Sequence, residues 1–319
     1  MTETATARQE APPERVSLEP SQDFVLTEHI EDMTARAMTY LEIGMAVHFA
    51  GPAGAGKTTL AFHLAARLGR PVVLMHGDDE FGSSDLVGRD TGFRRSKVVD
   101  NYISSVLRTE ERVNSVWMEN RLTTACQLGY TLIYDEFTRS RPEANNPLLT
   151  VLEERILNVP GMRRGGEGYL AVHPEFRAIF TSNPDEYAGV HRGQDALLDR
   201  MVTMQVGHFD RDTEVQIVAS KTGLALEQTG YVVDLVRALR GASEAGNLPS
   251  IRAAFSIARV LVHRGASASP DDATFRWVCR DVLGSSISKL TPQGHSLPTS
   301  VVDDVVSRLY REATEHVTH

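Results

Sequence analysis

The segment from Gly51 to Thr58 constrains the fold of this chain more strongly than any other part of the sequence. It reads GPAGAGKT, follows a short apolar run at Met45–Phe49, and precedes a segment with a leucine at every fourth position. A glycine-rich loop that joins a strand to a helix and ends in Lys-Thr is the P-loop pattern of nucleotide-binding proteins. The sequence therefore predicts an α/β domain with a phosphate-binding loop.

The residue types in this loop each serve phosphate binding. Glycines let backbone N–H groups curl around phosphate oxygens, and the helix start adds the positive end of its dipole. We expect Lys57 to reach the β and γ phosphates of ATP and the Thr58 hydroxyl to ligate Mg²⁺. The Lys-Thr pair and its flanks disfavour an ordinary glycine turn. The predicted nucleotide-binding residues are Gly51, Pro52, Ala53, Gly54, Ala55, Gly56, Lys57, Thr58 and Thr59.

An acidic pair follows the apolar run Thr131–Tyr134. Asp135 lies 78 residues beyond Lys57, and Glu136 comes directly after it. Open α/β sheets present ligand sites at the carboxyl ends of their strands, so we expect Asp135 to hold the hydrated metal. Glu136 is expected to orient and polarise the attacking water. An isolated Asp-Glu pair more often begins a solvated loop, but the P-loop favours the functional interpretation here.

Three further polar residues are candidates for the reaction. Asn183 follows the predicted strand Arg177–Thr181, where its amide could hold the γ-phosphate or the water; a turn-forming Asn-Pro is the alternative. Arg200 and Arg252 each lie near a predicted helix, and a guanidinium aimed at the γ-phosphate stabilises charge that grows toward the transition state. Taken singly, each arginine is better explained as a surface charge.

The chain divides into three segments of different character. Residues 1–22 are rich in Thr, Glu, Pro and Ala, as disordered tails are. Residues 23–209 alternate apolar strands with helices, which is typical of a parallel sheet with both faces covered. Residues 210–319 show helical stripes and predict a small all-helical domain. These stripes are Val232, Val233, Val236 and Leu239; Ile251, Phe255, Ala258 and Val262; Phe275, Val278, Cys279 and Val282; and Val302, Val305, Val306 and Leu309.

Composition argues against several classes of function. The net charge of −9 makes nucleic acid an improbable main partner. The two cysteines, Cys126 and Cys279, are far apart and form neither a disulfide framework nor a zinc motif. The first twenty residues lack the apolar region of a secretory signal, and no apolar run approaches the ~18 residues of a membrane span. We therefore expect a cytoplasmic protein that does not enter a membrane.

The order of these elements resembles an AAA+ module of the MoxR group, and within that group the family of gas-vesicle protein N. The resemblance covers residues from about 45 to 255. It rests on the stretches HFAGPAGAGKTTLA, SDLVGRDTGF, LTTACQLGYTLIYDEFTRSRPEANNPLLTVLEERIL, FTSNPDEYAGVH, DALLDRM and LPSIRAA.

The resemblance implies a fold and a role for each candidate residue. The fold is an AAA+ P-loop NTPase domain with a parallel sheet, followed by a small all-helical lid domain. Asn183 matches the sensor 1 residue, Arg200 the arginine finger that acts on a neighbouring subunit's ATP, and Arg252 the sensor 2 arginine of the lid. The stretch at Thr91–Phe93 resembles the helix-2 insert, and residues 159–172 resemble the hairpin before sensor 1.

The same resemblance implies an ATPase that couples hydrolysis to gas vesicle assembly and growth by acting on other vesicle proteins. The expected assembly is a ring-like homo-oligomer, a hexamer by the family pattern, in the cytoplasm and associated with gas vesicles. Alternatives remain open at this point. They are a MoxR-type chaperone for another protein partner, a nucleotide-gated scaffold with little turnover, and a small-molecule kinase that shares the P-loop.

Overall fold

The computed structural model describes residues 24–100, 108–160, 168–183, 195–241 and 249–289, together with 303–304, 306–308 and 310–311. The expected tail at 1–22 lies outside the described residues, as do Val302, Val305 and Leu309 of the last predicted stripe. The helices are α1 Glu28–Glu42, α2 Lys57–Leu68, α3 Ser83–Val87, α4 Arg121–Leu128, α5 Asn146–Leu152, α6 Asp195–Leu198, α7 Arg211–Thr222, α8 Leu226–Gly241, α9 Ile251–Arg264 and α10 Ala273–Lys289, with 3-10 turns η1 Phe137–Arg139 and η2 Pro142–Asn145. The strands are β1 Ala46–Ala50, β2 Val72–His76, β3 Gly88–Asp100, β4 Arg108–Glu119, β5 Thr131–Asp135, β6 Ile156–Asn158, β7 Tyr169–Ala171, β8 Arg177–Ser182 and β9 Met201–Gln205.

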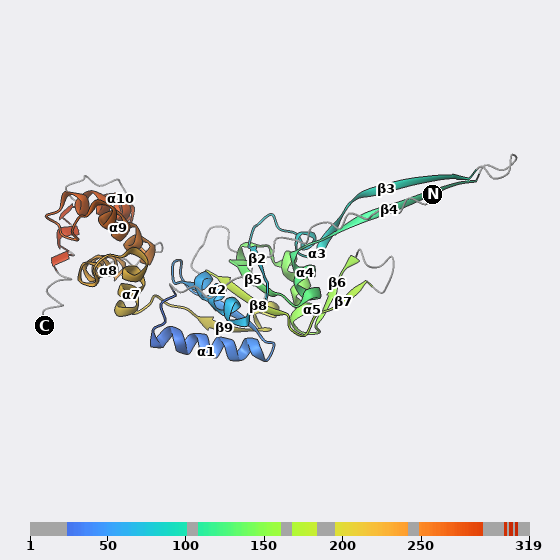
Figure 1. Ribbon diagram of the computed structural model, residues 1–319, viewed down its shortest axis with the longest axis horizontal. Helices are drawn as coiled ribbons and strands as arrows, with labels where there is room; N and C mark the ends of the chain where they lie inside the picture. The colour runs from blue at the N-terminus through green and yellow to red at the C-terminus, as the bar shows by residue number, and fades with distance from the viewer. Residues whose placement is uncertain are drawn as a thin grey trace, which may run out of the picture.

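A five-stranded sheet with the order β2-β5-β8-β1-β9 forms the centre of the α/β part (Figure 1). Its neighbouring strands are all parallel, so their carboxyl ends lie at one edge. Strand β8 lies between β1 and β5, which places the P-loop and the Asp135–Glu136 pair two strands apart. The expectation of a parallel sheet is confirmed, and β9 adds an edge strand that the sequence did not indicate.

Both faces of the inner strands β1, β5 and β8 are buried, which explains why these strands are largely apolar. Successive residues of β5 enter different cores: Leu132 and Tyr134 pack with α4 and α5, whereas Ile133 packs with Leu41 of α1 and Leu64 of α2. Helix α2 ends where the sequence predicts, because Gly69 takes the left-handed conformation (φ 66°) that favours glycine at a helix C-cap.

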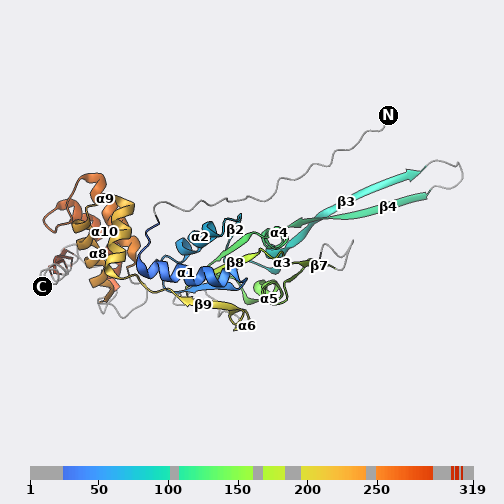
Figure 2. The ribbon, with the colours of Figure 1, turned by 60° about the horizontal axis from the view of Figure 1, so that its bottom comes forward.

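Two antiparallel hairpins interrupt the α/β part. Strands β3 and β4 form a long hairpin that extends away from the sheet (Figures 1 and 2). The sequence indicated an insert only at Thr91–Phe93, which lies within β3. The second hairpin pairs β6 with β7, so its strands begin just before the predicted 159–172 segment; residues 161–167 lie outside the described part.

Helices α7 to α10 pack around their own apolar core at the opposite end from the long hairpin (Figure 1). Val233 and Cys279 are buried there, as their stripes predict. The predicted stripe of α9 is partly wrong, because Val262 is 43% exposed and the buried positions are Ile251, Ala254, Ile257, Ala258 and Leu261. Of the helices in the described ranges, none combines the length and apolar character that crossing a bilayer requires.

Candidate nucleotide-binding site

The P-loop connects the carboxyl end of β1 to the first turn of α2. Gly54 and Gly56 adopt positive φ angles of 77° and 83°, which side chains rarely tolerate. Lys57 is buried, and its Nζ donates hydrogen bonds of 2.7 Å to the carbonyl oxygens of Gly51 and Pro52. The loop therefore curls around the lysine ammonium at the start of a helix, as a phosphate-binding loop requires.

Three oxygen-bearing side chains from different elements meet beside this loop. The Thr58 hydroxyl donates a hydrogen bond of 2.7 Å to Oδ1 of Asp135, and the Thr181 hydroxyl donates one of 2.5 Å to the same oxygen. The parallel register brings them together, because Asp135 and Thr181 lie at adjacent strand ends. A hydroxyl and a carboxylate are ligands that Mg²⁺ prefers, so the residues present fit this metal. Thr181 was not predicted from the sequence.

The backbone of Glu136 is held in place next to these three side chains. Its φ of 52° is unusual for a residue other than glycine, and its N–H donates a 2.9 Å hydrogen bond to the Thr181 hydroxyl. A Cβ on Gly77 would lie 2.0 Å from the Glu136 carbonyl oxygen, so only glycine fits there. The Glu136 carboxylate forms an ion pair with Arg139 of η1, a partner that the sequence did not indicate.

Asn183 lies directly after β8, at the same edge of the sheet. Its side chain is buried, and its Oδ1 has no hydrogen-bond partner among the described residues. Buried polar groups are normally hydrogen-bonded, so an orphaned amide oxygen in a pocket indicates a polar ligand there. Asn183 therefore fits the placement expected of a group that meets the γ-phosphate or its water.

A polar pocket of about 170 Å³ joins these elements. We call it the polar pocket, and it is lined by Ala53, Gly54, Gly56, Lys57, Thr58, Thr59, Glu136, Arg139, Thr181, Asn183 and Arg252. Arg252 reaches it from the first turn of α9, in the C-terminal helices. The approach is close: a Cβ on Gly54 would lie 2.4 Å from Cβ of Ser250, the residue that caps α9.

An apolar pocket of about 150 Å³ adjoins the polar pocket and shares with it Gly54, Gly56, Thr59 and Arg252. Phe24 and Val25 reach it from the segment before α1, while Phe209, Ile251 and Phe255 reach it from the C-terminal part. Apolar walls beside a phosphate loop suit a flat aromatic base. The sequence did not predict this pocket, because its residues are dispersed along the chain and belong to no local motif.

Arg200 does not line either of these pockets. It follows α6, where its Nη1 donates a 2.5 Å hydrogen bond to the Ala196 carbonyl and its guanidinium forms an ion pair with Glu153. The structure thus brings together Lys57, Thr58, Asp135, Glu136, Asn183 and Arg252, and it places Arg200 elsewhere.

The side chain of His48 links β1, the strand before the P-loop, to its two neighbouring strands. It is buried on β1, where Nε2 lies 2.8 Å from the Ser182 hydroxyl and Nδ1 lies 3.0 Å from the Thr203 hydroxyl. Burial, with a smaller contribution from the Lys57 charge, lowers the pKa of His48 to about 4. His48 is therefore neutral near pH 7 and links three strands through side-chain hydrogen bonds.

Comparisons with known proteins agree with this geometry. Residues 46–201 match the AAA domain (dynein-related subfamily). The gas vesicle ATPase GvpN of Ancylobacter aquaticus is 50% identical over 275 residues, which cover 86% of this chain and 77% of that protein. The gas vesicle ATPase GvpN1 of Halobacterium salinarum (strain ATCC 700922 / JCM 11081 / NRC-1) is 41% identical over 271 residues, covering 84% and 76%.

A solved structure supports the fold alone. The crystal structure of NtrX from Brucella abortus in complex with ADP superposes with a TM-score of 0.52 at 17% sequence identity. The match covers 92% of this chain and 66% of that one.

Proposed function

This chain belongs to the family of the gas vesicle ATPases GvpN, and from that premise we propose that it couples ATP hydrolysis to gas vesicle assembly and growth by acting on other vesicle proteins. The chain is an AAA+ ATPase, and a nucleotide binds in its α/β part. The observation that carries the proposal is the meeting of Lys57, Glu136 and Arg252 around one pocket, with Asp135 bonded to Thr58 beside it, in a chain half identical to a gas vesicle ATPase.

Each residue of the site has its own role in ATP binding or hydrolysis. Lys57 and the P-loop amides hold the phosphates, while the apolar pocket holds the base. Thr58 and Asp135 hold Mg²⁺, which neutralises phosphate charge when bound. Glu136 orients the attacking water and takes up its proton as the water oxygen bonds to the γ-phosphorus and the bond from that phosphorus to the β,γ-bridging oxygen breaks, so that ADP leaves. Asn183 holds the γ-phosphate or the water, and Arg252 contacts the γ-phosphate from the lid.

The proposed working form is a ring of identical subunits, with six as the expected number. Its support is the position of Arg200, which lies outside its own subunit's polar pocket and is held by Glu153. Such an arginine is suited to reach the ATP of a neighbouring subunit and complete that site. Residues 23–209 are the proposed nucleotide-binding domain and residues 210–319 the proposed lid. The net charge of −9 favours protein partners over nucleic acid.

A complementation experiment tests the vesicle role. In a gas-vesicle-forming host that lacks its own member of this family, the wild-type chain should restore vesicle size and number in electron micrographs. Glu136→Gln should fail although the protein accumulates, while Asp234→Asn, which changes an ion pair between α7 and α8 away from both pockets, should succeed. Equal rescue by Glu136→Gln would show that hydrolysis is not required, and absence of rescue by the wild type would argue against the vesicle role.

A further inference from the structure

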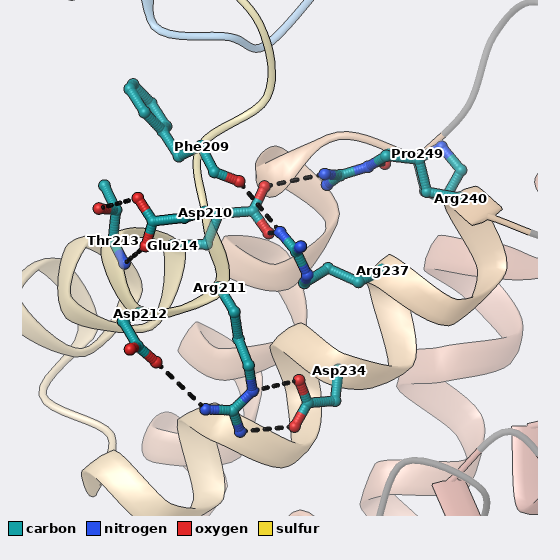
Figure 3. Close-up of polar contacts among 10 residues, drawn as sticks. All are labelled: Phe209, Asp210, Arg211, Asp212, Thr213, Glu214, Asp234, Arg237, Arg240 and Pro249. Atoms are coloured by element: carbon teal, nitrogen blue, oxygen red, sulfur yellow. Dashed lines mark hydrogen bonds and ion pairs between the residues drawn. The ribbon is translucent and has the colours of Figure 1, made fainter. Parts of the chain in front are cut away.

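An ionic cluster around the buried Glu214 joins two of the C-terminal helices (Figure 3). We call it the Glu214 cluster, and it comprises Glu214 of α7 with Arg237 and Arg240 of α8. Glu214 is only 2% exposed. Its Oε2 accepts a 3.2 Å hydrogen bond from Nη1 of Arg237, and its Oε1 accepts one of 2.9 Å from Nη1 of Arg240. One carboxylate thus holds two guanidinium groups.

Each arginine of the cluster also holds a backbone carbonyl outside it. Nη1 of Arg237 donates a 3.0 Å hydrogen bond to the carbonyl of Phe209, and Nε of Arg240 donates one of 3.0 Å to the carbonyl of Pro249 (Figure 3). Because the acceptors are main-chain atoms, these bonds fix the path of the chain at two places. Both places lie beside the nucleotide site.

The two anchored segments both contact the nucleotide site. Phe209 lines the apolar pocket, while Pro249 precedes Ser250, the α9 cap that packs on Gly54. Arg252, two residues beyond Ser250, lines the polar pocket and the edge of the apolar pocket that adjoins it. Glu214 therefore joins the wall of the base pocket to the helix start that carries Arg252.

The charge of Glu214 is essential to this connection. A buried charge is costly unless it is paired, and removing one member of a buried ionic group leaves the others uncompensated. Without the carboxylate, the two guanidinium groups would repel each other and would lose the acceptor that sets their orientation. The carbonyls of Phe209 and Pro249 would then no longer be held in one arrangement.

The same helices provide a matched contrast. Arg211 of α7 donates to both carboxylate oxygens of Asp234 of α8 at 2.6 Å (Figure 3). This pair joins α7 to α8 as the Glu214 cluster does, but neither residue lines the nucleotide pockets. Its loss should loosen the helices without moving Phe209 or Arg252.

We propose that Glu214 is a positioning residue that fixes Phe209 and Arg252 relative to each other, so that contacts to the base and to the γ-phosphate of ATP form together. The inference rests on the proposed function in assigning the two pockets to the two ends of ATP. By this inference, the position of the base-pocket wall at Phe209 determines how well Arg252 reaches the γ-phosphate.

The test is a double-mutant cycle in nucleotide binding. Affinities for ADP and for a non-hydrolysable ATP analogue are measured by calorimetry on the full chain. The variants are Glu214→Gln, Arg252→Ala, Asp234→Asn and the double variants that combine Arg252→Ala with each of the other two. Thermal unfolding without nucleotide is recorded for each protein, which separates a loss of stability from a loss of positioning.

We expect Glu214→Gln to weaken the binding of ADP by about tenfold and that of the ATP analogue by more, because the contact of Arg252 with the γ-phosphate is lost as well. Arg252→Ala should weaken the binding of the analogue more than the binding of ADP. In the Glu214→Gln background, the losses of affinity that Arg252→Ala causes for the two ligands should agree within about twofold. In the Asp234→Asn background, the difference between these losses should be as large as in the wild type. The inference would be overturned by additive losses of affinity from Glu214→Gln and Arg252→Ala. It would also be overturned if Asp234→Asn weakened binding as much as Glu214→Gln, or if Arg252→Ala did not weaken the binding of the analogue.

A second variant covers the case in which Glu214→Gln does not fold. Arg237→Met keeps an unbranched apolar stem in place of a side chain that is already 35% exposed, and it removes the bond to Phe209. It should weaken ADP and the analogue about equally, and unchanged ADP affinity would contradict the inference. None of these readouts requires hydrolysis or vesicles, so a failure of the proposed function would be visible separately as absent phosphate release or absent vesicle rescue.

Discussion

The Arg200 guanidinium is ion-paired with the Glu153 carboxylate of the same subunit, outside the pocket that contains Lys57. If Arg200 completes a neighbour's site, Arg200→Ala should leave ATP binding intact and lower turnover by about a hundredfold or more. Mixing it with Lys57→Ala should restore part of the activity, since a mixed ring contains complete composite sites, and dilution should abolish the recovery.

The Glu153 ion pair supplies the control for that experiment. If Arg200 served only to anchor α6 to α5, Glu153→Gln would reduce phosphate release as much as Arg200→Ala. We expect Glu153→Gln to retain most of the turnover. Co-assembly of the two inactive variants without any recovery would argue against the trans role.

Lys57→Ala should abolish ATP binding, because the ammonium and its contacts to the phosphates disappear together. Titration with a fluorescent ATP analogue measures this directly. Thermal unfolding serves as the control, since the buried Lys57 also bonds the carbonyls of Gly51 and Pro52. A folded variant that binds nucleotide as tightly as the wild type would remove the P-loop assignment.

Glu136→Gln should bind ATP with near wild-type affinity and lose hydrolysis, because an amide cannot take up a proton from water. The amide can still accept from Arg139, so the local fold is retained. Bound ATP should accumulate and favour the assembled state in size-exclusion chromatography. Phosphate release at the wild-type rate would exclude Glu136 as the residue that orients the water.

Gly54→Ala should weaken nucleotide binding by moving the lid away from the P-loop. The added methyl would lie 2.4 Å from Cβ of Ser250, and the φ of 77° adds backbone strain. Gly69→Ala is the matched control, since it has a φ of 66° and no atom within 4 Å of the new Cβ. Both variants should lose stability, whereas only Gly54→Ala should lose nucleotide affinity. Equal nucleotide affinities of the two variants would contradict the close approach of Ser250 to Gly54.

His48 should make stability depend on pH. Its pKa is lowered on folding from 6.5 to about 4, so the unfolded chain takes up the proton more readily. The stabilisation is complete above pH 6.5 and is lost as the pH falls toward 4, with a total of about 3 kcal/mol. Between pH 7 and 5, the free energy of unfolding should fall by about 2 kcal/mol more in the wild type than in His48→Gln, measured by urea denaturation. An equal fall in the free energy of unfolding for the two proteins would contradict this role of His48.

The nucleotide-binding end of the sheet could be predicted because its signals are local. A P-loop needs glycines and Lys-Thr in a fixed order, and a buried parallel strand that ends in Asp135–Glu136 stands out against the polar residues around it. The strands that lead to the P-loop, to Asp135 and to Asn183, and the helix before Gly69, were therefore predicted close to their bounds in the structure. The named roles of Asn183, Arg200 and Arg252 came from the resemblance, and the roles of all the candidate site residues stay predictions.

What the sequence did not show depends on contacts between distant positions. Glu214 meets Arg240 across 26 residues, and Phe24 and Phe209 line one pocket although 185 positions separate them in the sequence. The β3–β4 hairpin was missed for another reason. Segments such as GRDTGFRRSKVVD lack the alternation of apolar and polar residues that marks a strand packed on a core.

That hairpin has a mechanical consequence. Twelve residue pairs in one antiparallel ladder form an arm of roughly 40 Å, at about 3.3 Å per residue along its 13-residue strand. Turning such an arm by ten degrees about its root carries its far end through roughly 7 Å, by the same strand geometry. Its root adjoins α3, which β3 follows directly, and α4, which begins two residues after β4 and packs on β2 and β5 of the central sheet. A rotation too slight to unpack the core is therefore magnified into a stroke longer than a side chain.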